Sequence, residues 1–489
     1  MNGGESRWHG KPELAGADER SDPTSALVSL HDALQRGDAS DDPLAHHHTT
    51  KTSNTAVAHA DLVRPSGDSP SPRRPLRSPP PPLPPPPPSS RRHTPRALMA
   101  QLTVASPTNI AVIKYWGKRD TALNLPINSS VSLTINQADL RTVTTVTVSK
   151  DFEKDRLWLN GEEEDVSASK RVQKVFAMVR GRSRQWEGMK VHVVSVNNFP
   201  TAAGLASSAA GYAALAFALG KLYAVEESYP GELSTIARVG SGSACRSLAG
   251  GFVAWDMGSR EDGADSCARQ VAPAEHWPEL QVLILVVSDK KKAVSSTAGM
   301  QTAVETSPLL AHRAAHVVPA RMLAMEAAYL KKDFAAFAQL AMQDSNQFHA
   351  TCLDTFPPIF YLNDVSRAVI QFVHAFNSAC GETRMGYTFD AGPNAVLLVQ
   401  QQHAVQALAA VLTHFPAEPG SEASYVNRPA MQQEAMALGP PAGLAAAFPL
   451  EPQVGVIKHV YHTDVGPGAR LLEPSESLAD AAGMPLRTK

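Results

Sequence analysis

The chain has 489 residues, with 45 Lys and Arg against 47 Asp and Glu, so its formal net charge at pH 7 is −2. This balance excludes a strongly basic nucleic-acid-binding protein, and any anion site must therefore be local. The cysteines Cys245, Cys267, Cys352 and Cys380 are far apart and form no C-x-x-C pair, which argues against a disulfide framework or a zinc site. A reducing compartment fits best, and we expect a cytoplasmic protein that binds no nucleic acid.

The longest uncharged apolar stretch, at about 199–220, is long enough to cross a bilayer. It consists mainly of Ala, Gly and Ser, which insert into membranes poorly compared with Leu, Ile or Phe. We therefore predict a buried helix here and no membrane partner.

The amino-terminal part of the chain has a composition unlike the rest. A run of prolines at 79–88 favours polyproline II, and residues 1–64 are rich in Asp, Ser, His and Thr without clear periodicity. We predict a disordered, Pro-rich tail over 1–98. It is either an untethered tail, or an error in the predicted start of the gene, or a ligand for SH3 or WW domains.

From residue 99 onwards the pattern is that of a folded α+β protein, with strands and helices mixed but without regular βαβ alternation. Leu157–Leu159 followed by Asn160-Gly161 predicts a β-hairpin. Segments that are rich in Val and Thr, or wholly apolar, predict strands at 101–104, 131–133, 142–148, 191–195, 282–287, 396–399 and 456–460. Helical spacing predicts helices at 169–179, from about 205, and at 300–330, 333–346 and 358–379.

The most informative segment is a Gly- and Ala-rich loop that runs into a helix, Asn198–Gly211. Small side chains such as Gly204 let backbone N–H groups approach an anion, and the helix N-terminus adds its partial positive charge. Ser207 and Ser208 add hydroxyl donors. The segment is not a Walker A loop, so it indicates either a phosphate cradle or a tightly packed Ala/Gly helix.

Further clusters combine cations, hydroxyls and one acid; they occupy 114–120, 240–248, 288–300 and 387–394. Each taken alone could be a solvated face or an ordinary turn. Together they describe a site with several cations, many hydroxyls and one carboxylate, Asp390. Such a site suits a highly phosphorylated small substrate and a nucleotide.

Several long motifs of the sequence resemble those of a known family. The shared motifs are Asn109–Asp120, Leu123–Ser132, Asn197–Gly211, Gly240–Gly251, Val286–Met300, Asp344–Asn346, Phe348–Asp354 and Tyr387–Asn394. Over about 100–470 the chain resembles the mevalonate diphosphate decarboxylases of the GHMP kinase superfamily. The resemblance implies a two-lobed GHMP kinase fold, with an N-terminal lobe like ribosomal protein S5 domain 2 at 99–288 and a ferredoxin-like C-terminal lobe at 289–489.

The resemblance also implies a reaction. The family converts (R)-5-diphosphomevalonate and ATP into isopentenyl diphosphate, ADP, phosphate and CO2, uses Mg²⁺, and commonly forms homodimers. The alternatives are a phosphomevalonate decarboxylase or a mevalonate 3-kinase-type GHMP enzyme. A non-catalytic scaffold is a further alternative, but it should have lost Asp390, Ser208 or Arg246, and all three are present.

Carried over by matching motifs, the resemblance assigns roles to individual residues. Asp390 matches the catalytic aspartate, Arg246 would hold the substrate carboxylate, and Asn109 would steady that arginine. Lys114 would balance charge near the transferred phosphoryl group. The positions that match substrate-binding residues are Tyr115, Trp116, Gly117, Lys118, Arg171, Ser241, Gly242, Ser243, Ala244, Cys245 and Thr297. Gly204, Ser207 and Ser208 would bind the ATP phosphates, and no dedicated protein cage for the metal is visible.

Overall fold

The structure is a computed structural model that describes residues 99–199, 207–288 and 292–486. The predicted tail at 1–98 and the loop residue Gly204 lie outside these ranges. Arg91–Lys489 forms one compact unit.

The strands of this unit form three larger sheets and one short pair. The first sheet has the spatial order β16 (Arg470–Leu471), β1 (Met99–Pro107), β6 (Arg141–Ser149), β9 (Lys190–Asn197), β7 (Arg156–Leu159) and β8 (Glu162–Glu164). The second has the order β11 (Ala268–Ala272), β10 (Phe252–Trp255), β5 (Ser130–Thr134) and β2 (Asn109–Ile113). The third has the order β13 (Met385–Phe389), β14 (Ala395–Gln400), β12 (Leu280–Val286) and β15 (His459–Asp464). The pair consists of β3 (Lys118–Asp120) and β4 (Leu125–Pro126). Between these described strands the pairings are antiparallel, except that of β7 with β9.

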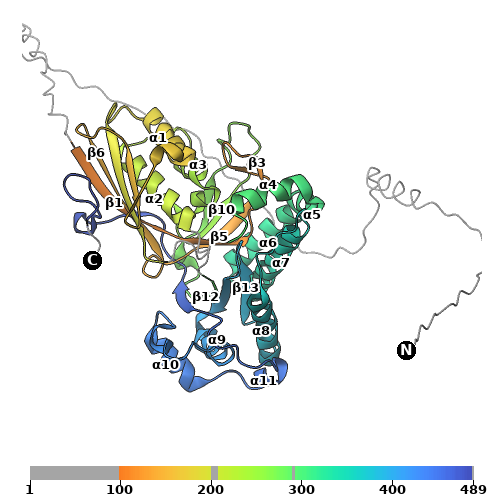
Figure 1. Ribbon diagram of the computed structural model, residues 1–489. Helices are drawn as coiled ribbons and strands as arrows, with labels where there is room; N and C mark the ends of the chain where they lie inside the picture. The colour runs from red at the N-terminus through yellow and green to blue at the C-terminus, as the bar shows by residue number, and fades with distance from the viewer. Residues whose placement is uncertain (1–98, 200–206, 289–291, 487–489) are drawn as a thin grey trace, which may run out of the picture. The chain divides into compact units, whose positions relative to one another are not determined.

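The helices fall into two groups. Those of the amino-terminal half are α1 (Lys170–Arg182), α2 (Ser207–Leu222) and α3 (Glu232–Gly240), followed by a 3-10 helix, Gly242–Ser247. Those of the carboxy-terminal half are α4 (Ser296–Thr306), α5 (Pro308–His312), α6 (Val318–Lys331), α7 (Phe334–Leu353), α8 (Asp364–Cys380), α9 (Gln401–His414), α10 (Pro429–Leu438) and α11 (Leu444–Ala447). In Figure 1, α1 to α3 lie beside the first sheet, whereas α7 and α8 run along β13 of the third.

The alanine-rich helix α2 packs against β1 and β6 of the first sheet. Its residues Ala213, Ala214 and Ala218 are fully buried in the core of that sheet, as predicted for a buried helix. Small side chains allow this close approach to the strands. Among the described helices, none has the length and apolar character needed to span a membrane.

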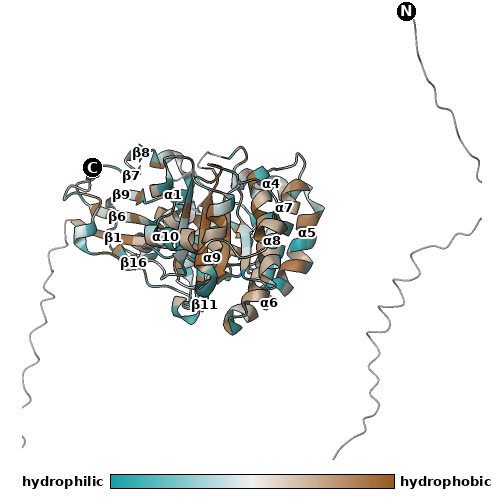
Figure 2. Ribbon diagram, turned by 90° about the horizontal axis from the view of Figure 1, so that it is seen from below, coloured by the Kyte–Doolittle hydropathy of each residue, from teal (hydrophilic) through white to brown (hydrophobic). Residues whose placement is uncertain are grey.

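Strand β12 is the centre of the carboxy-terminal half, because it is buried on both faces. Val282 and Ile284 pack into a core shared with the second sheet and with α6 and α7, whereas Leu283 and Leu285 pack into a core with α8 and α9. This follows from the alternation of side chains along a strand, which divides a wholly apolar segment between two cores. Figure 2 shows the hydrophobic residues concentrated on the strands that the helices enclose.

Most of the predicted elements are confirmed. The hairpin turns through Asn160 and Gly161, both with positive φ, as a type I′ turn requires. Helix α1 begins where predicted, after Ser169, whose side chain accepts a hydrogen bond from the Val172 N–H. All four cysteines are free.

The predicted helix at 300–330 is wrong as a single element. Ser307 has extended backbone angles before Pro308, since the residue before a proline disfavours the helical region. The chain therefore forms α4, α5, a π-helical turn at Arg313–Val317, and α6. The last predicted strand starts later than expected, at His459. Sequence reasoning missed the strands β2, β3, β4, β10, β11, β13 and β16.

Two strands pair with sheets on the other side of the predicted lobe boundary. Although β12 precedes residue 288, it pairs with β14 and β15 of the third sheet. Near the other end of the chain, β16 returns to pair with β1 of the first sheet. The lobe division between 288 and 289 stays a prediction.

We expect Gly386 to be required for the close packing of α7 on β13. A Cβ atom at this position would lie 2.8 Å from Ala338 Cβ and 3.1 Å from its Cα, so the helix backbone would have to move. Gly386→Ala should therefore lower the free energy of unfolding by about 1–3 kcal/mol, measured by urea denaturation. The matched control is Gly181→Ala in α1, where a Cβ would meet no atom within 4 Å. Equal stability of the two variants would contradict this account.

Candidate active site

A cavity of about 560 Å³ opens beside the ends of β2 and β13. The 3-10 helix at 242–247 and the start of α4 complete its walls. Of the predicted site residues it brings together Asn109, Lys114, Tyr115, Trp116, Lys118, Arg171, Ser207, Ser208, Ser241, Gly242, Ser243, Arg246, Thr297 and Asp390. Residues up to 281 positions apart in the chain thus line one cavity, so the sequence clusters describe a single site.

Lys114 and Asp390 meet across this cavity from two different sheets. Lys114 follows β2 and Asp390 follows β13, and the lysine Nζ lies 2.6 Å from the aspartate Oδ1. The lysine side chain is 3% exposed and the aspartate 36% exposed. Burial lowers the pKa of Lys114, and the neighbouring Asp390 carboxylate opposes that effect by favouring the charged ammonium.

Arg246 is a buried cation held only by neutral groups. Its guanidinium donates to Ser130 Oγ at 2.7 Å, to Ser132 Oγ at 3.0 Å and to Asn109 Oδ1 at 3.3 Å. Asn109 in turn donates to Ser247 Oγ and to the Ser243 carbonyl. A buried charge is stable only with a counter-charge or a full set of hydrogen bonds, so the guanidinium is prepared to receive an anion from the cavity.

The segment after Lys114 forms an aromatic wall of the cavity. The Tyr115 ring packs on Trp255, with ring centroids 4.7 Å apart, and Trp116 packs edge-on against Phe348 at 4.8 Å. The Tyr115 hydroxyl and the Trp116 Nε1 are buried and have no hydrogen-bond partner in the part of the chain that the structure describes. Burial raises the pKa of Tyr115 well above its usual value, so the phenol keeps its proton and can donate.

Lys118 and Arg171 form the cationic rim. Lys118 Nζ donates to Asn124 Oδ1 at 2.7 Å, and the Asn124 amide donates to the carbonyls of Arg238 and Val239. Burial, with a smaller contribution from Arg171, lowers the pKa of Lys118. Sequence reasoning missed Asn124, although it lies within a shared motif, because its role depends on residues more than a hundred positions away.

A further lysine that the prediction omitted, Lys292, also lines the cavity. Its Nζ donates to Ser296 Oγ at 2.8 Å and to the Ala391 carbonyl at 3.0 Å, directly after Asp390. Burial lowers its pKa as well. The run of three lysines at 290–292 in the sequence was the available signal, but a run does not tell which member turns inward.

Hydroxyl groups also line the cavity. Ser208 Oγ lies 3.4 Å from Ser241 Oγ, which brings the start of α2 next to the end of α3. Ser207, Ser243 and Thr297 complete the set of predicted hydroxyls.

Three predicted residues lie behind the cavity wall. Gly117 has φ +90°, and a Cβ there would lie 2.6 Å from Ile127, so its role is to turn the chain. Ala244 and Cys245 are fully buried. The Cys245 thiol donates to the Gly242 carbonyl, and burial raises its pKa to about 12, so it has no thiolate character. The other lining residues that the prediction omitted are Ala111, Ser296, Met300, Phe348 and Ala391.

The electrostatic character of the cavity is its clearest property. Among the described residues, five cationic side chains line it against a single carboxylate; they are Lys114, Lys118, Arg171, Arg246 and Lys292, with Asp390 as the acid. Such a site attracts a polyanion. Among the described residues no cluster of three or more His, Cys, Asp or Glu could hold a metal ion.

His349 lies on α7 near this site, and we expect it to stay neutral. Burial, and after it the charge of Lys114, lower the pKa of the imidazole to about 3. Below pH 6.5 the unfolded chain binds a proton at this histidine that the folded chain does not, so stability should fall as the pH drops from 6.5 towards 3. Between pH 7.5 and 5.0 the loss due to His349 should be about 2 kcal/mol.

Urea unfolding of the wild type and of His349→Gln at both pH values measures this contribution. The variant should lose less stability on acidification than the wild type, by that amount. Equal losses in the two proteins would show that His349 titrates normally.

Comparison with known proteins identifies the family. A family model for the diphosphomevalonate decarboxylase-like N-terminal domain matches residues 106–268, and one for the mevalonate 5-diphosphate decarboxylase C-terminal domain matches 282–472. The human diphosphomevalonate decarboxylase is 54% identical over 399 residues, which cover 79% of this chain and 98% of the human protein.

Solved structures agree. Mevalonate diphosphate decarboxylase from Trypanosoma brucei is 39% identical, with a TM-score of 0.73, and the match covers 78% of this chain and all of that one. A second structure, MDDEF in complex with MVAPP, AMPPCP and magnesium, is 31% identical, with a TM-score of 0.58 over 77% of this chain and 99% of that one. With the cationic cavity, these matches show that the chain belongs to the diphosphomevalonate decarboxylase family, with its GHMP kinase fold.

Proposed function

We propose that this chain uses the cavity to convert (R)-5-diphosphomevalonate and ATP into isopentenyl diphosphate, ADP, phosphate and CO2. The observation that carries the proposal is the charge that the described residues give the cavity, with five cations, one carboxylate and a buried Arg246 whose hydrogen-bond partners there are neutral. A substrate with a diphosphate and a carboxylate, together with ATP, supplies the missing negative charge.

Asp390 and Lys114 would act in the first step, the transfer of the ATP γ-phosphoryl group to the C3 hydroxyl of the substrate. This tertiary hydroxyl is a poor nucleophile, and the partly exposed Asp390 carboxylate is placed to orient it and accept its proton. Phosphoryl transfer depends mainly on positioning and on charge stabilisation. The buried Lys114 ammonium would hold the carboxylate in place and offset charge on the transferred group.

Arg246 would act in the second step. The C3–O bond breaks and phosphate leaves with the bonding pair, which leaves positive character at C3. The electrons of the bond between C2 and the carboxyl carbon then form the C2–C3 double bond, and CO2 departs. Arg246, aligned by Asn109, Ser130 and Ser132, would orient the carboxylate so that this bond lies parallel to the developing empty orbital.

The remaining groups would hold the phosphates. The Tyr115 hydroxyl is an unpartnered donor suited to the substrate diphosphate, together with Lys118 and Arg171. Ser241, Ser243 and Thr297 add hydroxyls to that set, and Trp116 and Gly242 shape its wall. Ser207 and Ser208, at the start of α2, would bind the ATP phosphates.

The donor set fits Mg²⁺, which binds proteins through few carboxylates and keeps phosphate and water ligands. The Asp390 carboxylate and the Ser207 and Ser208 hydroxyls are the oxygens that line the cavity near the proposed phosphates. The ion would neutralise phosphate charge during the transfer. The MDDEF complex, which contains MVAPP, AMPPCP and magnesium, supports these ligands for the present chain.

We also propose the wider context that the family resemblance implies. The enzyme would be a cytoplasmic homodimer with an N-terminal lobe ending near residue 288 and a C-terminal lobe carrying Asp390. Size-exclusion chromatography with light scattering tests the dimer.

The test of the reaction is a product assay on the purified chain with ATP, Mg²⁺ and 1-¹⁴C-labelled (R)-5-diphosphomevalonate. We expect ¹⁴CO2 and ADP in equal amounts. ADP without CO2 would indicate the mevalonate 3-kinase-type alternative. Activity only with the monophosphate would indicate a phosphomevalonate decarboxylase.

Replacing Asp390 by Asn should abolish turnover, with a loss of about 10²–10⁴-fold or more, because the carboxylate that accepts the proton is gone. The dissociation constants of ATP and substrate, measured by calorimetry, should change by less than about threefold, since the cationic residues that bind the phosphates are intact. Near-normal turnover of Asp390→Asn would remove Asp390 from this role.

A further inference from the structure

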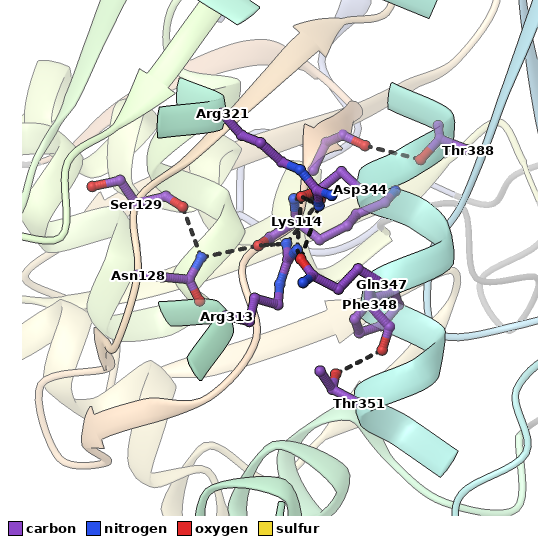
Figure 3. Close-up of polar contacts among 11 residues, drawn as sticks. Lys114, Asn128, Ser129, Arg313, Arg321, Asp344, Gln347, Phe348, Thr351 and Thr388 are labelled. Atoms are coloured by element: carbon purple, nitrogen blue, oxygen red, sulfur yellow. Dashed lines mark hydrogen bonds and ion pairs between the residues drawn. The ribbon is translucent and has the colours of Figure 1, made fainter. Parts of the chain in front are cut away.

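A network of buried charges lies directly behind the Lys114–Asp390 pair. The carboxylate of Asp344, on α7, accepts two hydrogen bonds from the Arg313 guanidinium, at 2.7 and 2.8 Å, and both side chains are 0% exposed. Arg321 adds a third contact to Asp344 at 3.1 Å. Figure 3 shows the two arginines converging on Asp344 beside α7, with the Gln347 amide oxygen accepting from both.

This network holds the backbone of Lys114 on both sides. Asp344 Oδ2 accepts the Lys114 N–H at 2.7 Å, and Arg313 Nη2 donates to the Lys114 carbonyl at 3.2 Å. Asn128 donates to the same carbonyl at 3.0 Å. Arg313 reaches this position from the π-helical turn between α5 and α6, a kind of irregularity that often occurs at functional sites.

The next residues of α7 hold the other half of the pair. Ser345 Oγ accepts the N–H of Phe389 at 3.0 Å, and Phe389 directly precedes Asp390. Asn346 Oδ1 accepts from the Tyr387 hydroxyl at 3.0 Å, two residues earlier on β13. One turn of one helix therefore contacts the strand end that carries Lys114 and the strand end that carries Asp390.

From this arrangement we propose that Asp344 and Ser345 are positioning residues for the reaction. Adjacent on a rigid helix, they set the separation of the Lys114 ammonium and the Asp390 carboxylate, and Arg313 fixes the Asp344 end. The proposal rests on the proposed function of this site. It explains how an ion pair with one buried and one partly exposed member has a defined geometry.

The primary variant is Ser345→Ala, which removes the acceptor of the Phe389 N–H without changing any charge. The matched control is Thr351→Val on the same helix, which removes a fully buried hydroxyl that donates to the Phe348 carbonyl, away from the Lys114–Asp390 pair. We expect Ser345→Ala to lower kcat about 10- to 100-fold, because small displacements of reacting groups are costly, with KM for both substrates within about twofold. Thr351→Val should keep the wild-type kcat.

A second variant, Arg313→Lys, preserves the buried charge but loses the fork that reaches both Asp344 and the Lys114 carbonyl. Like Ser345→Ala, this variant should have a lower kcat and an unchanged KM. Wild-type kcat in both Ser345→Ala and Arg313→Lys, or an equal loss in Thr351→Val, would overturn the proposal.

The pH profile of kcat gives a readout that a merely structural role would not move. The charges that face the Lys114 ammonium are those of Asp390, Asp344 and Arg246, and the neutral His349 lies beside them. If the carboxylate of Asp390 moves away in Ser345→Ala, the lysine loses the contact that favours its charged form. The alkaline limb should then shift to lower pH by about 1 unit.

The wild-type enzyme is assayed in parallel for ¹⁴CO2 and ADP. A wild type without coupled products contradicts the proposed function itself. If the wild type forms the coupled products, and Ser345→Ala keeps both the wild-type kcat and the wild-type alkaline limb, the positioning role of Ser345 is contradicted and the proposed function stands.

Discussion

The site depends on one ion pair, between the Lys114 ammonium and the Asp390 carboxylate, at 2.6 Å. Its members come from the ends of two strands in different sheets, so the pair exists only when the second and third sheets are held in register with each other. The core shared by β2, β5, β10 and β12 supplies that constraint through apolar packing. The polar contacts of α7 then fix the two strand ends within it.

The buried charges in and behind the cavity are of two kinds: some are paired with an opposite charge of the protein, and Arg246 is hydrogen-bonded only to neutral side chains among the described residues. Asp344 is buried and contacts two arginines, so its charge is compensated within the protein. Arg246 is equally buried, but its partners are two serines and an asparagine. A buried cation without a hydrogen-bonded carboxylate costs folding free energy, and under the proposed function the substrate carboxylate would restore the balance on binding.

How far the sequence predicts the molecule differs between local and long-range features. The Asn160-Gly161 turn and the helix that begins next to Ser169 depend on neighbouring residues, and both were predicted correctly. Most of the residues that line the cavity were predicted, because the motifs shared with the family named them one by one. The link from Lys114 to Asp344 spans 230 residues, and no local pattern indicates which buried acid meets which backbone. The break at Ser307 was missed because helical spacing continues on both sides of it.

The return of β16 to the first sheet has a consequence for how the protein is made. Leu471 pairs with Val104, so the edge of a sheet that begins near residue 99 is completed only by residues close to the carboxyl end. Strand β12 likewise pairs with β15, which lies about 180 residues later along the chain. These two strand pairings can therefore form only after nearly the whole chain has been synthesised, so neither sheet can be completed in the order of synthesis.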